Sequence, residues 1–225
     1  MPVYNEQEAI EYVVNEWINA LDKLQINYTL CLMNDGSKDN TLSKINELAS
    51  KFQTIKVIDK LNSGHGQTCI MGYQLAIEQG ADWIFQIDSD GQCDPQYFEK
   101  FIPFTEQFKC IYGVRKTRDD GMQRTIVSHF VTLFTWVATS KFVRDPNVPY
   151  RLMHADILKQ FVYTVPKDFH LANIYISVCC AKLCKIKWIP IHFKDRMGGI
   201  ASVKTFSFVK HGFKLFKQLR SASAE

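Results

Sequence analysis

Residues 83–95, WIFQIDSDGQCDP, decide how the rest of the sequence is interpreted. A mainly apolar run over 83–87 ends in two aspartates, Asp88 and Asp90, and a Gly-Gln pair and an Asp-Pro turn follow. Short apolar runs are typical of buried strands in α/β proteins, and ligands gather at the carboxyl ends of such strands. Because residues i and i+2 of an extended segment point the same way, both carboxylates can face one ion, and their oxygens suit Mg²⁺ or Mn²⁺. The alternative is an acidic turn that only caps a helix beginning near Pro95.

The composition is that of an ordinary soluble globular protein with room for one large domain or two small ones. The 225 residues are 46% hydrophobic and 22% charged, and the net charge of +4 gives no reason to expect a nucleic-acid partner. The seven cysteines form no CxxC pair and have no zinc-type spacing, which predicts free thiols in a reducing cytoplasm. No apolar run reaches the roughly 18 residues of a spanning helix, so we do not expect this chain to cross a membrane on its own.

Short apolar stretches alternate with helical patterns, which predicts βαβ units and a parallel sheet. The predicted strands are 28–33, 55–58, 83–87, 110–114 and 187–193. The predicted helices are 8–24, from about 40 to 52, one that ends at 78 after the turn 62–66, 96–105, 126–138 and 174–183, and 145–153 is expected to be a turn with two prolines. Polar loops follow four of these strands, where an open α/β sheet binds its ligand. A receiver-like signalling domain also carries acids at strand ends, but it would leave the second half of the chain unexplained.

Four loop motifs together resemble a known family. They are Pro2–Glu6 (PVYNE), 34–41 (NDGSKDNT), 62–66 (NSGHG) and 88–95 (DSDGQCDP). Their order and spacing are similar to those of family 2 glycosyltransferases of the GT-A fold, particularly the dolichol- or polyprenyl-phosphate sugar synthase branch. The resemblance covers nearly the whole chain and implies a mainly parallel central sheet flanked by helices. It divides the chain into a glycosyltransferase domain at 1–200, with a nucleotide-sugar half at 1–118 and an acceptor half at 119–200, and a C-terminal helix at 201–225.

The resemblance also implies roles for individual residues. Asp88 and Asp90 would ligate a Mg²⁺ or Mn²⁺ ion that bridges the diphosphate of a nucleotide-sugar donor, and transfer would invert the anomeric carbon. The residues expected on the nucleotide side are Pro2, Tyr4, Glu6, Asp35, Asn62, Gly64 and Asp88. The expected catalytic residues are Asp90, Gln92, Arg115, Arg151 and Arg196, of which Arg151 would lie behind the donor sugar and Arg196 on a loop that closes over the diphosphate. A surface ion pair near Asp195 is the alternative for Arg196.

The acceptor is predicted from its cations. Arg115, Arg124 and Ser128 would bind a lipid phosphate, which is already ionised and needs no general base. Ion pairs of these arginines with Asp119 and Asp120 are the alternative. A second hypothesis is a glycan hydroxyl acceptor, which requires a carboxylate such as Asp156 or Asp168.

Both ends of the sequence carry a prediction. Residues 203–220 form an amphipathic, basic helical pattern that suits the surface of an anionic membrane, so we expect a peripheral place at the inner face of the cell membrane. A core-packing helix is the alternative.

Members of the family have a hydrophobic strand before the PVYNE motif, and this chain starts at the motif, so we expect an incomplete first strand and an empty or partly filled position in the sheet. A non-catalytic nucleotide-binding module is therefore the third hypothesis.

Overall fold

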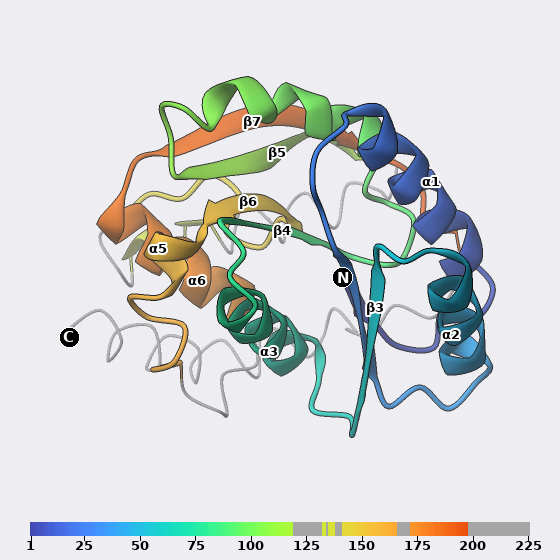
Figure 1. The fold of residues 1–225 in the computed structure, drawn as a ribbon. Coiled ribbons are helices and arrows are strands. Elements are labelled where there is room, and N and C mark those ends of the chain that lie inside the picture. The colour runs from blue at the N-terminus through green and yellow to red at the C-terminus, as the bar shows by residue number, and fades with distance from the viewer. Residues whose placement is uncertain (119–131, 134, 138–140, 166–171, 198–225) are drawn as a thin grey trace.

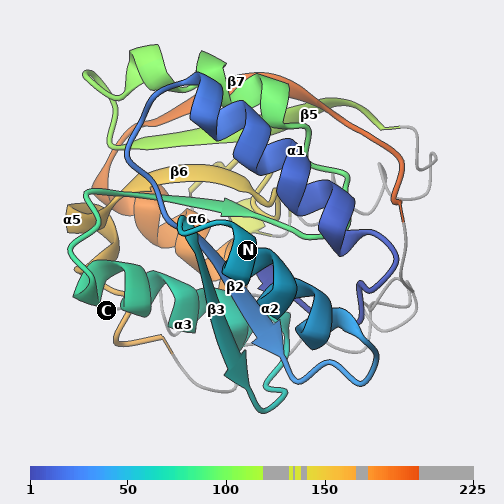
Figure 2. The same cartoon turned by 45° about the vertical axis from the view of Figure 1, so that its right-hand side comes forward.

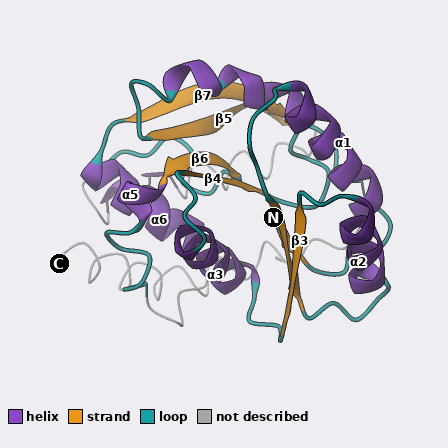
Figure 3. Cartoon of the chain, in the orientation of Figure 1, coloured by secondary structure: helices purple, strands orange, loops and turns teal. Residues whose placement is uncertain are grey.

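The computed structural model describes residues 1–118, 132–133, 135–137, 141–165 and 172–197 (Figure 1). Strands lie in the interior and helices pack around them, as Figure 3 shows by secondary structure. None of the helices in these ranges has the length and apolar character needed to span a membrane. The predicted helix at 126–138 lies mostly, and the one at 201–225 entirely, outside the described residues.

The first sheet is built from three parallel strands in the order β1-β2-β3. These are β1 (Pro2–Val3), β2 (Leu30–Asp35) and β3 (Ile55–Lys60). Helix α1 (Ile10–Lys23) connects β1 to β2, and α2 (Thr41–Lys51) connects β2 to β3. The parallel arrangement predicted from the alternating pattern is confirmed, and it brings the carboxyl ends of all three strands to one edge.

The second sheet has the order β4-β6-β5-β7. Strand β6 (Tyr150–His154) runs antiparallel to both β4 (Trp83–Ile87) and β5 (Cys110–Arg118), while β7 (Ile186–Phe193) runs parallel to β5. Among the described strands, β2 and β4 are not hydrogen-bonded to each other. The two sheets therefore meet without pairing, and β1 has only two residues.

Helices cover the sheets from opposite sides. Helix α1 lies on one side, and α3 (His65–Glu78) lies on the other with α6 (Ala172–Leu183), while the short α5 (Ala155–Leu158) follows β6 (Figure 2). The predicted apolar face of α1 is buried, and Trp17 packs against Phe85 and Tyr150 with ring centroids 5.5 and 6.0 Å apart. This aromatic cluster joins α1 to strands β4 and β6 of the second sheet.

Two predicted elements differ from the structure. The predicted helix at 96–105 is two 3₁₀ segments, Pro95–Lys100 and Ile102–Phe104, since Pro103 lacks the N–H that a continuous helix requires. The predicted turn at 145–153 is wrong at its second half, where Tyr150–His154 forms the buried strand β6. Two prolines and an arginine are not typical of an interior strand, so the sequence pattern did not predict one here. The arginine, Arg151, can be buried because its guanidinium forms hydrogen bonds inside the protein.

Candidate active site

Four polar loops gather where strands β1 to β4 end. The loop 4–6 follows β1, Asp35 ends β2, the loop 61–64 follows β3, and Asp88 and Asp90 follow β4. The segment 194–197 after β7 lies against the Asp90 turn, because Met197 N–H donates to the Asp90 carbonyl at 3.1 Å. The edge that the sequence predicts as the ligand site is therefore formed by five separate segments.

The loop after β1 is held by the loop after β2. The Asn5 N–H donates to Ser37 Oγ at 3.0 Å, and the Lys38 N–H donates to Asn5 Oδ1 at 2.8 Å. Asn5 has a φ of 52°, a left-handed conformation that asparagine tolerates. These bonds fix the backbone on either side of Asn5. The Tyr4 side chain there is exposed, and the Glu6 side chain is buried.

Asp35 organises the loop after β3. Its carboxylate accepts the N–H groups of Ser63 at 2.8 Å and Gly64 at 2.9 Å, and the Asn62 amide donates to its carbonyl at 2.8 Å. Gly64 has a φ of 85°, which favours glycine at this position. Three of the seven residues predicted on the nucleotide side, Asp35, Asn62 and Gly64, lie together here, and their role in binding stays a prediction.

Lys60 is a functional candidate that sequence reasoning missed. Its ammonium group pairs with Asp35 and donates to Ser63 Oγ at 2.7 Å and Thr68 Oγ1 at 3.2 Å. Lys60 lies directly opposite Asp35 in the parallel register of β2 and β3. The strand predicted at 55–58 ends two residues before Lys60, so the prediction did not place Lys60 opposite Asp35. Aligning the polar ends of the two predicted strands would have shown this pair.

Asp88 contacts a histidine that carries no assignment from the sequence. His65 Nε2 lies 2.9 Å from Asp88 Oδ1, and the pKa of His65 is raised well above its usual value by Cys69 and by Asp88. Burial acts to raise the pKa of Asp88, but the charge and hydrogen bond of His65 outweigh it, so this pKa is lowered. The contact places the start of α3 beside the first strand-end aspartate.

Arg196 connects two of the predicted acidic residues. Its guanidinium lies 2.5 Å from Glu6 Oε1 and 3.5 Å from Asp90 Oδ2. The side chain reaches inward to the strand ends, which differs from the alternative of a surface pair near Asp195. The arginine partly neutralises the acids at the position where the sequence predicts the diphosphate.

Burial dominates the titration of both acids. It raises the pKa of Glu6 to about 7, although Arg196 acts in the opposite direction, and Glu6 Oε2 has no hydrogen-bond partner among the described residues. Burial and then the charge of Asp88 raise the pKa of Asp90. The negative charges of Asp88 and Asp90 repel each other, and a cation bound between them stabilises both charged carboxylates.

The turn 90–92 holds the segment after β7. Gln92 Nε2 donates to the Lys194 carbonyl at 3.2 Å, and Lys194 N–H donates to the Gln92 carbonyl at 3.0 Å. Gly91 has a φ of 80°, and a Cβ there would lie 2.6 Å from Met197 Cγ. The glycine therefore permits the close approach that brings Arg196 to the site.

Two predicted arginines are engaged inside the protein. Arg115 forms a bidentate ion pair with Asp145, with Nε–Oδ2 at 2.7 Å and Nη2–Oδ1 at 2.6 Å, so its partner is neither Asp119 nor Asp120 in this pair. Arg151 is 0% exposed and donates to the carbonyls of Val148, Asn173 and Pro146 at 2.5–2.8 Å. Arg151 is thus a positioning residue that ties the loop before β6 to the first turn of α6, and in this structure it presents no surface to a donor sugar.

The acceptor candidates are only partly described. Arg124, Ser128 and Asp168 lie outside the described residues. Asp156 is placed at the opposite end of β4 from Asp88, because Ala155 N–H donates to the carbonyl of Asp82, the residue before β4. The five residues of β4 separate the two ends by roughly 16 Å, so Asp156 is wrong as the base for a glycan hydroxyl.

Asp88 and Asp90 are suitable ligands for a hard divalent cation whose remaining ligands come from the substrate. Asp88 and Asp90 offer carboxylate oxygens, and burial first and the charge of Asp88 second raise the pKa of Asp90. In the described part of the chain, no group of three or more His, Cys, Asp or Glu side chains is arranged to hold a metal ion. Diphosphate oxygens and water would complete the coordination, as is usual for Mg²⁺.

Comparisons with known proteins agree with this architecture. The family model "Glycosyl transferase family 2" matches residues 1–165. Two relatives are named undecaprenyl-phosphate 4-deoxy-4-formamido-L-arabinose transferase. The Pectobacterium atrosepticum protein is 28% identical over 148 residues, which cover 64% of this chain and 44% of the relative. The Yersinia enterocolitica protein is 26% identical over 203 residues, which cover 88% and 60%.

The fold is also found among solved structures. Glucosyl-3-phosphoglycerate synthase from Mycobacterium tuberculosis, solved with Mn²⁺, uridine-diphosphate-glucose and phosphoglyceric acid, has a TM-score of 0.69 at 16% identity, covering 99% of this chain and 78% of that one. The complex of that enzyme with Mn²⁺, uridine diphosphate and phosphoglyceric acid has a TM-score of 0.70 at 15% identity, covering 99% and 76%. The chain spans about half the length of the curated relatives it matches. The family model covers most of the chain and the GT-A fold is confirmed, so this protein belongs to glycosyl transferase family 2.

Proposed function

We propose that this chain is the catalytic domain of a metal-dependent, inverting glycosyltransferase. It moves a sugar from a nucleotide-diphosphate sugar to polyprenyl phosphate or a related lipid-linked acceptor. The observation that carries the proposal is the meeting of Glu6, Asp90 and Arg196 at the strand ends, next to Asp88.

The donor side is supported by the charge arrangement. A nucleotide diphosphate brings negative charge, and Arg196 is a cation on the segment that contacts the Asp90 turn. Arg196 pairs with Glu6 and Asp90 in this structure, and in the proposed reaction it exchanges part of that pairing for the diphosphate. The loop of Asn62 and Gly64, shaped by Asp35, forms the nucleoside side of the same edge.

Asp88 and Asp90 would hold the Mg²⁺ or Mn²⁺ ion. When bound, the ion neutralises the charge that develops on the leaving nucleoside diphosphate. The chain's own contribution is to fix the two carboxylates: Asp88 through His65 and Asp90 through the Gln92 N–H at 3.1 Å. Gln92 positions the Arg196 segment through Lys194, so we assign it an orienting role beside the sugar.

The acceptor is proposed from chemistry and from relatives. A phosphate acceptor needs no general base, and Asp156 lies at the wrong end of β4 to serve as one. The relatives described above are named as undecaprenyl-phosphate sugar transferases, which favours a lipid phosphate. Arg115, Arg124 and Ser128 are the proposed phosphate contacts, and Arg115 would share its guanidinium with Asp145. We propose a peripheral place at the inner face of the cell membrane, where residues 201–225 would meet the lipid.

The decisive experiment is a thermal-shift panel of nucleoside diphosphates with and without Mn²⁺, on the wild-type chain, Asp90→Asn and Asp82→Asn. Ligand that binds the folded state raises the melting temperature. Asp82 is the matched control because it lies at the opposite end of the same strand. We expect the Mn²⁺-dependent shift in the wild type and Asp82→Asn, and its loss in Asp90→Asn. Unchanged Mn²⁺-dependent nucleotide affinity in Asp90→Asn would sink the proposal.

A transfer assay separates the remaining hypotheses. Sugar transfer to polyprenyl phosphate, with none to a glycan hydroxyl, is the expected result. Transfer to the glycan alone would replace the acceptor assignment. Nucleotide binding without turnover of any nucleotide sugar would support the non-catalytic module.

A further inference from the structure

Three thiols gather at the end of the second sheet that lies away from the candidate active site. Cys110 is the first residue of β5, and both β4 and β5 run antiparallel to β6. Cys110 therefore lies at the sheet end where β4 begins, whereas Asp88 follows the other end of β4. Cys180 is in the last turn of α6, and Cys184 is the residue that follows this helix. None of these cysteines has a role in the proposed function.

The register of the strands and the period of the helix bring the three side chains together. Cys110 lies opposite Ile186 in the parallel pair of β5 and β7, and Cys184 is two residues before Ile186. The Cys184 N–H donates to the Cys180 carbonyl at 2.9 Å, so these two side chains share one face of a helical turn. The Cys110 thiol is hydrogen-bonded to the thiols of both, and these three residues form the thiol cluster. Tyr112, on the same face of β5 as Cys110, is also hydrogen-bonded to Cys180.

The thiol cluster extends from the protein surface into the core. Cys110 and Cys180 are 0% exposed, while Cys184 is partly exposed. A reagent from solvent therefore reaches Cys184 first, and Cys110 can react only with the product formed at Cys184. The burial of the cluster thus determines the order in which its thiols react.

The surroundings of Cys184 favour its thiolate, which is the form of cysteine that reacts. The hydrogen bond from the Cys110 thiol lowers the pKa of Cys184; burial opposes this effect, and the charge of Lys109 supports it. Lys109 is the residue before Cys110 and pairs with Asp156, with Nζ and Oδ2 3.2 Å apart. Cys184 therefore combines access from solvent, a hydrogen-bond donor and a nearby cation.

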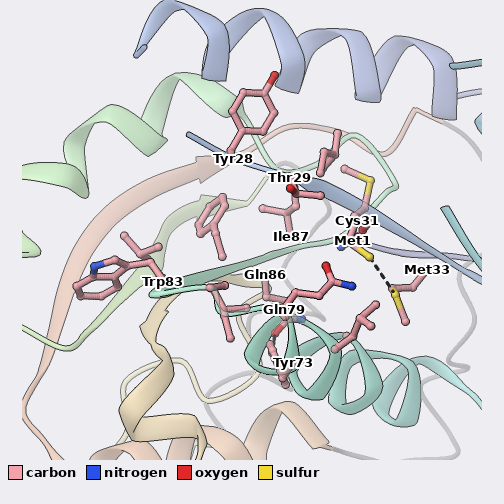
Figure 4. A pocket seen from close by; sticks show the side chains of 18 of the residues that line it. Met1, Tyr28, Thr29, Cys31, Met33, Tyr73, Gln79, Trp83, Gln86 and Ile87 are labelled. Carbon is pink, nitrogen blue, oxygen red and sulfur yellow. Dashed lines mark hydrogen bonds between the residues drawn. The ribbon is translucent and has the colours of Figure 1, made fainter. Parts of the chain in front are cut away.

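The other partly exposed thiols differ from Cys184 in this respect. Burial raises the pKa of Cys179 to about 11. Burial also raises the pKa of Cys31, whose thiol donates to Met33 Sδ at 3.4 Å on β2 (Figure 4). The thiolate fraction falls tenfold for each pKa unit, and the higher intrinsic nucleophilicity of a more basic thiolate offsets about half of this on a logarithmic scale. With about two pKa units between them, Cys184 should react roughly tenfold faster than Cys179.

We propose that Cys184 and Cys110 form a peroxide-reactive pair, in which hydrogen peroxide converts the two thiols into a disulfide that joins β5 to the end of α6. In the first step the Cys184 sulfur takes one oxygen of the peroxide, the O–O bond breaks, and Cys184 sulfenic acid and water form. In the second step the Cys110 sulfur attacks the Cys184 sulfur, the S–O bond breaks, and a second water leaves. The two thiols lose two electrons and two protons, and one peroxide molecule becomes two water molecules.

Geometry selects Cys110 over Cys180 as the partner of Cys184. Residues four apart on a helix have Cβ atoms about 5–6 Å apart, which is longer than the roughly 3.5–4.5 Å of a disulfide. Cys110 instead approaches Cys184 from the neighbouring strand, and paired strands lie about 4.8 Å apart. The new bond closes the long loop between residues 110 and 184, which restricts the unfolded chain and stabilises the folded one.

The test treats the reduced protein with a small molar excess of hydrogen peroxide at neutral pH and maps its cysteines by proteolysis and mass spectrometry. We expect a peptide pair linked through Cys110 and Cys184, and recovery of both thiols with dithiothreitol. The linked protein should melt at least about 5 °C higher than the reduced protein, because the disulfide closes a long loop. Neither nucleotide nor metal ion is added, so the result does not depend on the proposed function.

Three variants separate the roles of the thiols. Cys184→Ser removes the thiol that reacts first and should prevent the linkage. Cys110→Ala leaves the sulfenic acid of Cys184 without its partner, so dimedone should label Cys184 more strongly in this variant than in the wild type. Cys179→Ser is the matched control, since it removes a partly exposed thiol of the same helix, and it should form the linkage as the wild type does. Alkylation of the reduced wild type with iodoacetamide should be roughly tenfold slower at Cys179 than at Cys184.

The peptide map of the wild type decides the proposal without any substitution in the core. A linkage of Cys110 to Cys184 that dithiothreitol reverses supports it. A linkage through Cys180 in place of Cys110, or a first reaction at Cys31 or Cys179, overturns it. Sulfinic acid at Cys184 without linkage, or an unchanged number of thiols after treatment, overturns it as well.

Discussion

Glu6→Gln should make the protein more stable at neutral and weakly alkaline pH. Burial raises the pKa of Glu6 from 4.5 in the unfolded chain to about 7 in the folded one, against the opposing charge of Arg196. Below pH 4.5 both states carry the proton, and between pH 4.5 and 7 the unfolded state loses it first. The folded state then binds more protons, so the free energy of unfolding falls as pH rises through this window.

The size of the effect follows from the shift. A difference of about 2.5 pH units between the two states corresponds to on the order of 3 kcal/mol, at 1.36 kcal/mol per unit. The glutamine side chain of the variant has no charge to gain, so this loss of stability is absent, while a side-chain oxygen remains to accept from Arg196. The stability of Glu6→Gln relative to wild type should therefore rise by about 3 kcal/mol between pH 4.5 and pH 8.

Urea denaturation at half-unit pH steps measures this difference from midpoint and slope. Subtracting the wild-type curve from the variant curve removes the titration of the other groups, and the exposed Glu8→Gln is the matched control. Parallel curves for wild type and Glu6→Gln over the whole window would refute the reasoning. The same variant should lose donor affinity, which identifies Glu6 as a residue kept for function at a cost in stability.

Three further substitutions test the rest of the site. Arg151→Met should lower the free energy of unfolding by about 3 kcal/mol or more, measured in urea, because three buried carbonyls lose their donor; a loss below about 1 kcal/mol would contradict this. Gly91→Ala should cost about 1–3 kcal/mol and weaken donor binding, since the residue has a positive φ and its Cβ would overlap Met197; an unchanged thermal shift with nucleotide would show that the 194–197 segment plays no part. Asp156→Asn should leave sugar transfer within about twofold of wild type, because the residue lies at the far end of β4, and a loss of transfer in kinetic assays would restore it as a base candidate.

The sequence could predict the features that local pattern encodes. Apolar runs ending in polar residues located β2, β3 and β4, and the helical period located the buried face of α1. The strand-end position of Asp88 and Asp90 also follows from pattern alone. Arg196 was found only through its resemblance to a family motif, because nothing near it in the sequence indicates Glu6 as a partner 190 residues away.

The remaining features depend on contacts that the local sequence does not contain. An arginine usually indicates an exposed or functional position. Arg151 can be buried in a strand because three carbonyl groups surround its guanidinium, and the local sequence does not show this arrangement. His65 meets Asp88 because α3 packs against β4, so that the first residue of the helix lies beside the residue that follows the strand. Such pairings are decided by packing of distant elements, which outweighs local propensity.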